Sequence, residues 1–146
     1  MAPFLDKGHI LFTDNYYTSP TLASFFLENR THLCGTIRAN CYNFPRDLVN
    51  TDLDKGTAVS FYNTNTPMIA TKYRAEKDKA GGKPKVVFML STCHQPIKET
   101  YREIHKKPQA VKAYNSHMGG VDRVDQQLHG LQSLRKSYKW YKKLAF

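Results

Sequence analysis

Asp14, Asp122 and Asp125 are the residues whose positions in the sequence could support metal chemistry. Asp14 follows a short apolar run, Ile10–Thr13, where a buried strand is expected to open into a polar turn. Asp122 and Asp125 are three residues apart, so on a helix they share one side and repel each other. A carboxylate near an apolar stripe is costly unless it is paired or binds a cation. A divalent-cation site is one interpretation; an Asx turn at Asp14 and a neutral hydrogen-bond network that includes His117 are the alternatives.

Other catalytic patterns have little support in the sequence. Cys34, Cys41 and Cys93 lack the CxxC spacing of a zinc site and are expected to be reduced thiols, mostly in the interior. Cys93 and His94 are adjacent in sequence, which does not favour a facing nucleophile and base. The chain also has neither a GxSxG elbow nor a Walker phosphate loop.

The elements that would position these acids follow from turn residues and periodicity. Ser19 and Pro20 provide a helix N-cap and first position, so the first forty residues predict a strand, a helix and a strand, at 9–13, 20–29 and 31–38. Glycines and prolines then separate short β-rich runs at 57–62, 68–73 and 86–91. From Pro108 the apolar period is helical, with a kink or close backbone contact expected at Gly119 and Gly120.

Basic residues are in clear excess over acidic ones. The 146 residues carry 22 Lys and Arg against 12 Asp and Glu, a formal charge of +10. Such an excess favours polyanionic partners, because each phosphate contact releases counterions. No apolar run approaches the roughly 20 residues of a membrane span, and the first residues lack the basic-then-apolar order of a signal peptide. The cytoplasm or nucleus is therefore the default, and the prediction is a nuclear protein without a membrane partner. The candidate DNA-binding residues are Lys72, Arg74, Lys83, Lys85, Arg135, Lys136, Lys139, Trp140, Lys142 and Lys143.

Four segments of the chain together resemble the piggyBac transposase family. In order they are Phe12–Ser19 (FTDNYYTS), Cys34–Asn40 (CGTIRAN), Tyr114–Gln126 (YNSHMGGVDRVDQ) and Arg135–Trp140 (RKSYKW). The resemblance implies an α/β fold: a partial RNase H-like core of the DDE transposase type, interrupted by a small, mainly-β insertion subdomain. It assigns 1–40 to the core, 41–108 to the basic insertion, 109–131 to the last catalytic-core helix, and 132–146 to the start of a dimerisation and DNA-binding helical region.

The resemblance also implies roles for the three aspartates. Asp14 matches the second catalytic aspartate of the family, Asp122 the third, and Asp125 the additional acid one turn beyond. In the family these acids hold two Mg²⁺ ions, and the enzyme, expected to be a homodimer, excises a DNA element and inserts it at TTAA sites.

The first catalytic aspartate of the family would lie before Met1, so whether this chain is an enzyme stays open. The expected function is a fragment of a piggyBac-like DDE transposase domain that is inactive alone. The alternative is a non-catalytic DNA-binding or protein-interaction remnant of a domesticated or decayed transposon. An unrelated RNA-binding domain is a weaker third option, because the aromatic RNP motif and the GXXG loop are both absent.

Overall fold

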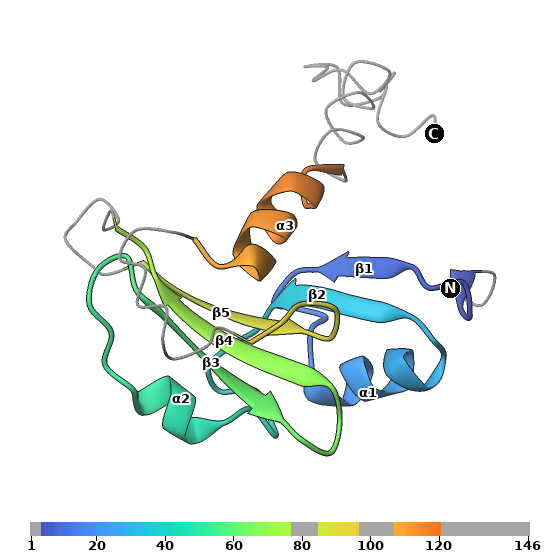
Figure 1. Cartoon of the computed structure of the whole chain (residues 1–146), viewed down its shortest axis with the longest axis horizontal. Coiled ribbons are helices and arrows are strands. Elements are labelled where there is room, and N and C mark those ends of the chain that lie inside the picture. The colour runs from blue at the N-terminus through green and yellow to red at the C-terminus, as the bar shows by residue number, and fades with distance from the viewer. Residues whose placement is uncertain (1–3, 77–84, 97–106, 121–146) are drawn as a thin grey trace, which may run out of the picture.

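A five-stranded mixed sheet organises the protein in the computed structural model, which describes residues 4–76, 85–96 and 107–120. The strands lie in the order β1-β2-β5-β4-β3 (Figure 1). Their bounds are β1 Ile10–Thr13, β2 His32–Thr36, β3 Ala58–Asn63, β4 Met68–Arg74 and β5 Val86–Ser91. β1 and β2 are parallel, and all other pairs are antiparallel. The α/β class predicted from the sequence is therefore confirmed.

Helix α1 (Pro20–Glu28) connects the two parallel strands. Parallel strands need such a crossover, because the chain must return from the end of β1 to the start of β2 at the other end of the sheet. It begins where the sequence predicts, since the Ser19 hydroxyl accepts a hydrogen bond from the Leu22 N–H at 3.1 Å and Pro20 occupies the first turn. Ala23 and Phe26 are its buried side chains and attach the helix to the sheet.

Helices cover both faces of the sheet. α1 and the short α2 (Arg46–Asn50) lie on one side, and α3 (Gln109–His117) lies on the other (Figure 1). The core on the α1 and α2 side includes Leu33, Leu48 and Leu90, and the core beneath α3 includes Cys34 and Met89. The alternation along β2 explains the division, because successive strand residues point to opposite faces. In the described part of the chain no helix is both long and apolar enough to cross a membrane.

The strands of residues 41–108 continue the sheet that β1 and β2 begin. β5 pairs directly with β2, with Cys34 opposite Ser91, and β4 and β3 extend the same sheet outward. The boundary predicted at residue 40 therefore crosses a continuous sheet, and a separate insertion subdomain is not confirmed. The sequence also missed α2, because five residues are too few to show a helical period.

The last helix is interrupted at the glycine pair, as the sequence predicts. α3 ends at His117, with Met118 as its C-cap, immediately before Gly119 and Gly120. The remainder of the predicted helix, 121–131, and the whole of 132–146 lie outside the described residues.

Candidate metal and DNA-binding site

Asp14 lies at the carboxyl end of β1, in a turn that fixes its carboxylate. The Tyr16 N–H donates to Asp14 Oδ1 at 2.9 Å, and the Thr18 N–H and hydroxyl donate to the Asp14 carbonyl at 3.1 and 2.7 Å. The Asx turn considered from the sequence is thus present. Asp14 Oδ2 has no hydrogen-bond partner within the described ranges. The turn therefore orients the carboxylate while it leaves one oxygen available to a ligand.

Gly35 allows this turn to approach the sheet closely. It lies in β2 directly opposite Thr13 of β1. A Cβ atom at Gly35 would be 2.5 Å from both the carbonyl oxygen and the hydroxyl of Thr13, and in still closer contact with the Thr18 hydroxyl. The two threonine hydroxyls are hydrogen-bonded to each other at 2.8 Å in that space. The absence of a side chain at Gly35 thus helps to hold the Asp14 turn in place.

The C-terminal end of α3 contacts the same strand. The His117 imidazole stacks on the Phe12 ring, with centroids 4.5 Å apart and planes inclined by 5°. Earlier in α3, the Tyr114 hydroxyl lies 3.4 Å from the Thr36 hydroxyl at the end of β2. Phe12 precedes Asp14 by two residues, and His117 precedes Asp122 by five. The C-terminal end of α3 therefore lies against β1, two residues before Asp14.

His117 does not form the buried polar network considered as an alternative. Its side chain is exposed, and Nδ1 lies 2.7 Å from the Ala113 carbonyl of its own helix. Asp122 and Asp125 lie outside the described residues, so the convergence of the three acids remains a prediction. Within the described residues, 4–76, 85–96 and 107–120, there is no group of three or more His, Cys, Asp or Glu side chains placed to hold a metal ion. Of the predicted ligands, Asp14 is the one whose geometry is described.

Comparison with known proteins identifies the family. A family model described as Transposase IS4 matches residues 1–146, and a solved structure is similar over nearly the whole chain. That structure is the cryo-EM structure of a piggyBac transposase synaptic complex with hairpin DNA, with a TM-score of 0.73 and 29% identity. The chain belongs to the piggyBac-type transposase family. The alignment covers 98% of this chain and 28% of the solved one, so the chain spans less than a third of that relative.

Lys72 has a structural role at the end of α2. Its side chain is 8% exposed, and its ammonium donates to the carbonyls of Val49 and Thr51 at 2.7 and 2.5 Å. The same ammonium lies 5.6 Å from the centroid of the Phe88 ring. Those carbonyls are at the end of α2, where the helix has no further internal donors. An ammonium bonded to two backbone carbonyls has fewer protons to offer a phosphate, so this geometry argues against the DNA contact predicted for Lys72.

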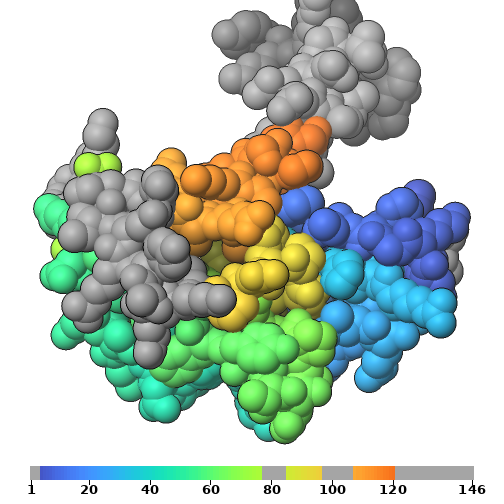
Figure 2. Space-filling model, in the orientation of Figure 1, coloured from blue at the N-terminus to red at the C-terminus, as the bar shows by residue number. Residues whose placement is uncertain are grey.

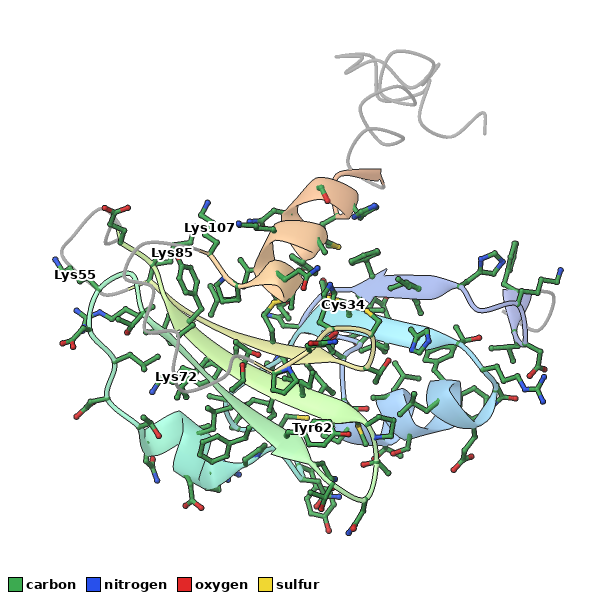
Figure 3. All side chains as sticks on the ribbon, in the orientation of Figure 1. Cys34, Lys55, Tyr62, Lys72, Lys85 and Lys107 are labelled. Carbon is green, nitrogen blue, oxygen red and sulfur yellow. The ribbon has the colours of Figure 1, made fainter. Side chains whose placement is uncertain are left out.

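The other basic residues predicted to bind DNA differ in how exposed their side chains are. Arg74 is half-buried, and its Nη1 donates to the Leu53 carbonyl at 2.9 Å. Lys85 is exposed at the start of β5 (Figure 3). The remaining candidates, Lys83, Arg135, Lys136, Lys139, Trp140, Lys142 and Lys143, lie outside the described residues. Sequence reasoning identified basic residues without distinguishing capping lysines from surface lysines.

Replacing Lys72 and Lys85 separately should distinguish these two roles. We expect Lys72→Gln to lower the free energy of unfolding by about 1–3 kcal/mol, because two helix-end carbonyls lose a charged donor. Lys85→Gln should leave stability nearly unchanged and weaken binding to duplex DNA by a factor of about three to ten at low salt. Urea denaturation and fluorescence anisotropy measure the two effects. A stable Lys72→Gln protein with lost DNA affinity would contradict this assignment.

The sequence did not predict a cluster of polar side chains beyond the end of β5. The Cys93 sulfur lies 3.3 Å from His94 Nδ1, and the Ser91 hydroxyl lies 2.6 Å from the same nitrogen. Burial, followed by the charge of Cys93, raises the pKa of the nearby Cys34 thiol to about 12, so Cys34 stays protonated and unreactive. Adjacent residues can thus bring sulfur and imidazole together where a strand ends in a bend, which the sequence alone did not suggest.

His94 should make stability depend on pH in the mildly acidic range. Burial lowers the pKa of its imidazole from the ordinary value of 6.5. The unfolded chain therefore takes up a proton at higher pH than the folded one, and stability should fall as the pH drops from 6.5 toward the folded pKa. His94→Gln should make the urea midpoint less dependent on pH across this window. The same pH dependence in both proteins would exclude His94 as its source.

Proposed function

We propose that this chain forms part of the DNA-cleaving core of a DDE transposase, in which Asp14, Asp122 and Asp125 act together. The observation that carries the proposal is the stacking of His117 on Phe12 at 4.5 Å. That contact fixes the end of α3 against β1 beside Asp14, and Asp122 follows within five residues. Asp14 would then meet Asp122 and Asp125, which are far from it in sequence, at the carboxyl end of β1, as binding of a shared cation requires.

The topology supports the finer proposal of an RNase H-like core. Parallel β1 and β2, joined by α1 and covered on the other face by α3, correspond to the strand, helix, strand and final helix expected of it. Asp14 comes at the carboxyl end of a parallel strand, the edge where α/β proteins commonly place functional groups. The relative with a TM-score of 0.73 was solved with hairpin DNA, which supports DNA as the partner.

The residues of the proposed site fit Mg²⁺ in their chemistry. Mg²⁺ prefers oxygen ligands and binds through one or two carboxylates and substrate phosphate, and Asp14 Oδ2 is a carboxylate oxygen without a partner in the described part of the chain. Bound Mg²⁺ would supply charge stabilisation to the attacking and leaving oxygens of a phosphate. The chain itself contributes the orientation, because the Tyr16 N–H fixes one carboxylate oxygen of Asp14 and Thr18 fixes its backbone carbonyl.

The assembly around this core is also a proposal that rests on the family. We infer that the site acts on transposon ends and TTAA targets, within a homodimer, in the nucleus. The 146-residue chain by itself is proposed to bind DNA rather than to cleave it. A non-catalytic DNA-binding role is the second candidate, and it is favoured by exposed lysines such as Lys85 and Lys107 at one end of the described sheet (Figure 3).

Titration of the chain with Mn²⁺, followed by electron paramagnetic resonance, tests the proposed site. Asp14→Asn should weaken Mn²⁺ binding by roughly tenfold or more, since even indirect changes around metal ligands cost about 10–100-fold. The variant should remain folded, because an asparagine oxygen can also accept the Tyr16 N–H. Asp47→Asn, an identical change at an exposed residue of α2, is the matched control. Equal Mn²⁺ affinity in all three proteins would reject the metal role and favour the DNA-binding alternative.

A further inference from the structure

Two tyrosines beside Asp14 are exposed far beyond what a folded core would explain. Tyr16 is 72% exposed and Tyr17 is 65% exposed. Their rings contact each other edge to face, with centroids 5.0 Å apart and planes inclined by 81°. Some aromatic residues, such as Phe26 at 4%, are buried in the core, and others, such as Tyr42 at 81%, are exposed singly. Tyr16 and Tyr17 differ from a singly exposed ring because they contact each other and lie two and three residues after Asp14.

The backbone holds this pair in a defined position. The Tyr16 N–H is hydrogen-bonded to the Asp14 carboxylate, and Thr18, one residue beyond Tyr17, donates twice to the Asp14 carbonyl. The tyrosines thus lie on a turn that is closed at both ends. Rings on a fixed turn lose little conformational entropy when they bind a flat ligand.

A cation lies over one of the two rings, that of Tyr16. The Arg38 guanidinium carbon is 5.8 Å from the centroid of the Tyr16 ring. Arg38 is exposed and follows the end of β2, the strand parallel to β1, so it reaches the sheet edge that carries Asp14. Aromatic faces beside a guanidinium match a ligand that has both flat rings and negative charge, which is the chemistry of a nucleic acid strand.

We propose that Tyr16 and Tyr17 form a stacking platform for unpaired DNA bases next to the scissile phosphate. The bases must be unpaired, because the faces of bases within a duplex are already covered by their neighbours. This inference rests on the proposed function and deepens it. The proposed function assigns Asp14 to the phosphate, and the platform assigns Tyr16 and Tyr17 to the bases beside it. The platform would select strand ends, hairpin tips or opened target sites over continuous duplex.

Fluorescence anisotropy with two labelled DNAs, one a hairpin with an unpaired tip and the other a blunt duplex of equal length, tests the platform. The wild-type chain should prefer the hairpin. Tyr16→Ala should weaken hairpin binding by about 5- to 100-fold, the range for loss of one base–aromatic stack. Duplex binding should remain within about twofold. Tyr16→Phe keeps the ring and should retain the preference.

Tyr62→Ala is the matched control. Tyr62 is 51% exposed on β3, at the opposite edge of the sheet from β1 (Figures 1 and 3), and its removal should change neither affinity. Photocrosslinking from 5-iodouracil at the hairpin tip, read by mass spectrometry, should label Tyr16 or Tyr17. Equal binding of both DNAs by wild type and Tyr16→Ala would overturn the platform and leave the DNA-binding proposal intact. No binding to either DNA would overturn both.

Discussion

Raising the KCl concentration from about 50 to about 200 mM should weaken binding of the chain to duplex DNA by a factor of roughly 100 to 1,000. The formal charge is +10, and Lys85 and Lys107 are exposed in the described part of the chain. If about five phosphates are neutralised, the released counterions give a slope of about −4.5 for log affinity against log salt. Anisotropy titrations of a fluorescent duplex at several salt concentrations measure this slope.

Individual charges should contribute separately to that slope. Lys85→Gln should reduce its magnitude by about one, as expected for one lost phosphate contact. Lys72→Gln provides the comparison. This substitution should leave the slope unchanged, because the Lys72 ammonium is already bonded to two backbone carbonyls. A slope near zero for the wild-type chain would reject an electrostatic mode of DNA binding.

Gly35→Ala should lower the free energy of unfolding by about 1–3 kcal/mol, the usual cost of overpacking a filled space. The added methyl would meet the Thr13 carbonyl oxygen at 2.5 Å. Because that oxygen belongs to the backbone of the neighbouring strand, it cannot rotate away as a flexible side chain would. The Asp14 turn must therefore shift, and Mn²⁺ affinity should fall with stability.

Urea denaturation and the Mn²⁺ titration together measure these two effects of the Gly35 substitution. Gly120→Ala is the matched control, since a methyl at Gly120 would meet no atom within 4 Å, and it should be close to neutral. A Gly35→Ala protein as stable as wild type, with Asp14 still able to bind Mn²⁺, would show that β1 and β2 tolerate a wider separation than the structure indicates.

Local signals in the sequence were sufficient for much of the fold. The Ser19 and Pro20 pair specified the start of α1, and the glycine pair at 119 and 120 indicated the end of α3. Runs of β-rich residues located β3, β4 and β5 to within one residue of their observed bounds. These features depend on neighbours only a few positions away, so a sequence can encode them without reference to the rest of the chain.

Sequence alone thus determined the family and, apart from α2, the elements of the described chain. Tertiary structure decided what depends on residues distant in the chain. It placed the Lys72 ammonium on the carbonyls at the end of α2, because β4 packs against that helix. It joined β5 to β2 in one continuous sheet, and it stacked His117 on Phe12 across more than a hundred residues. Burial and orientation arise from packing between elements, and composition, spacing and periodicity carry no record of which elements will meet.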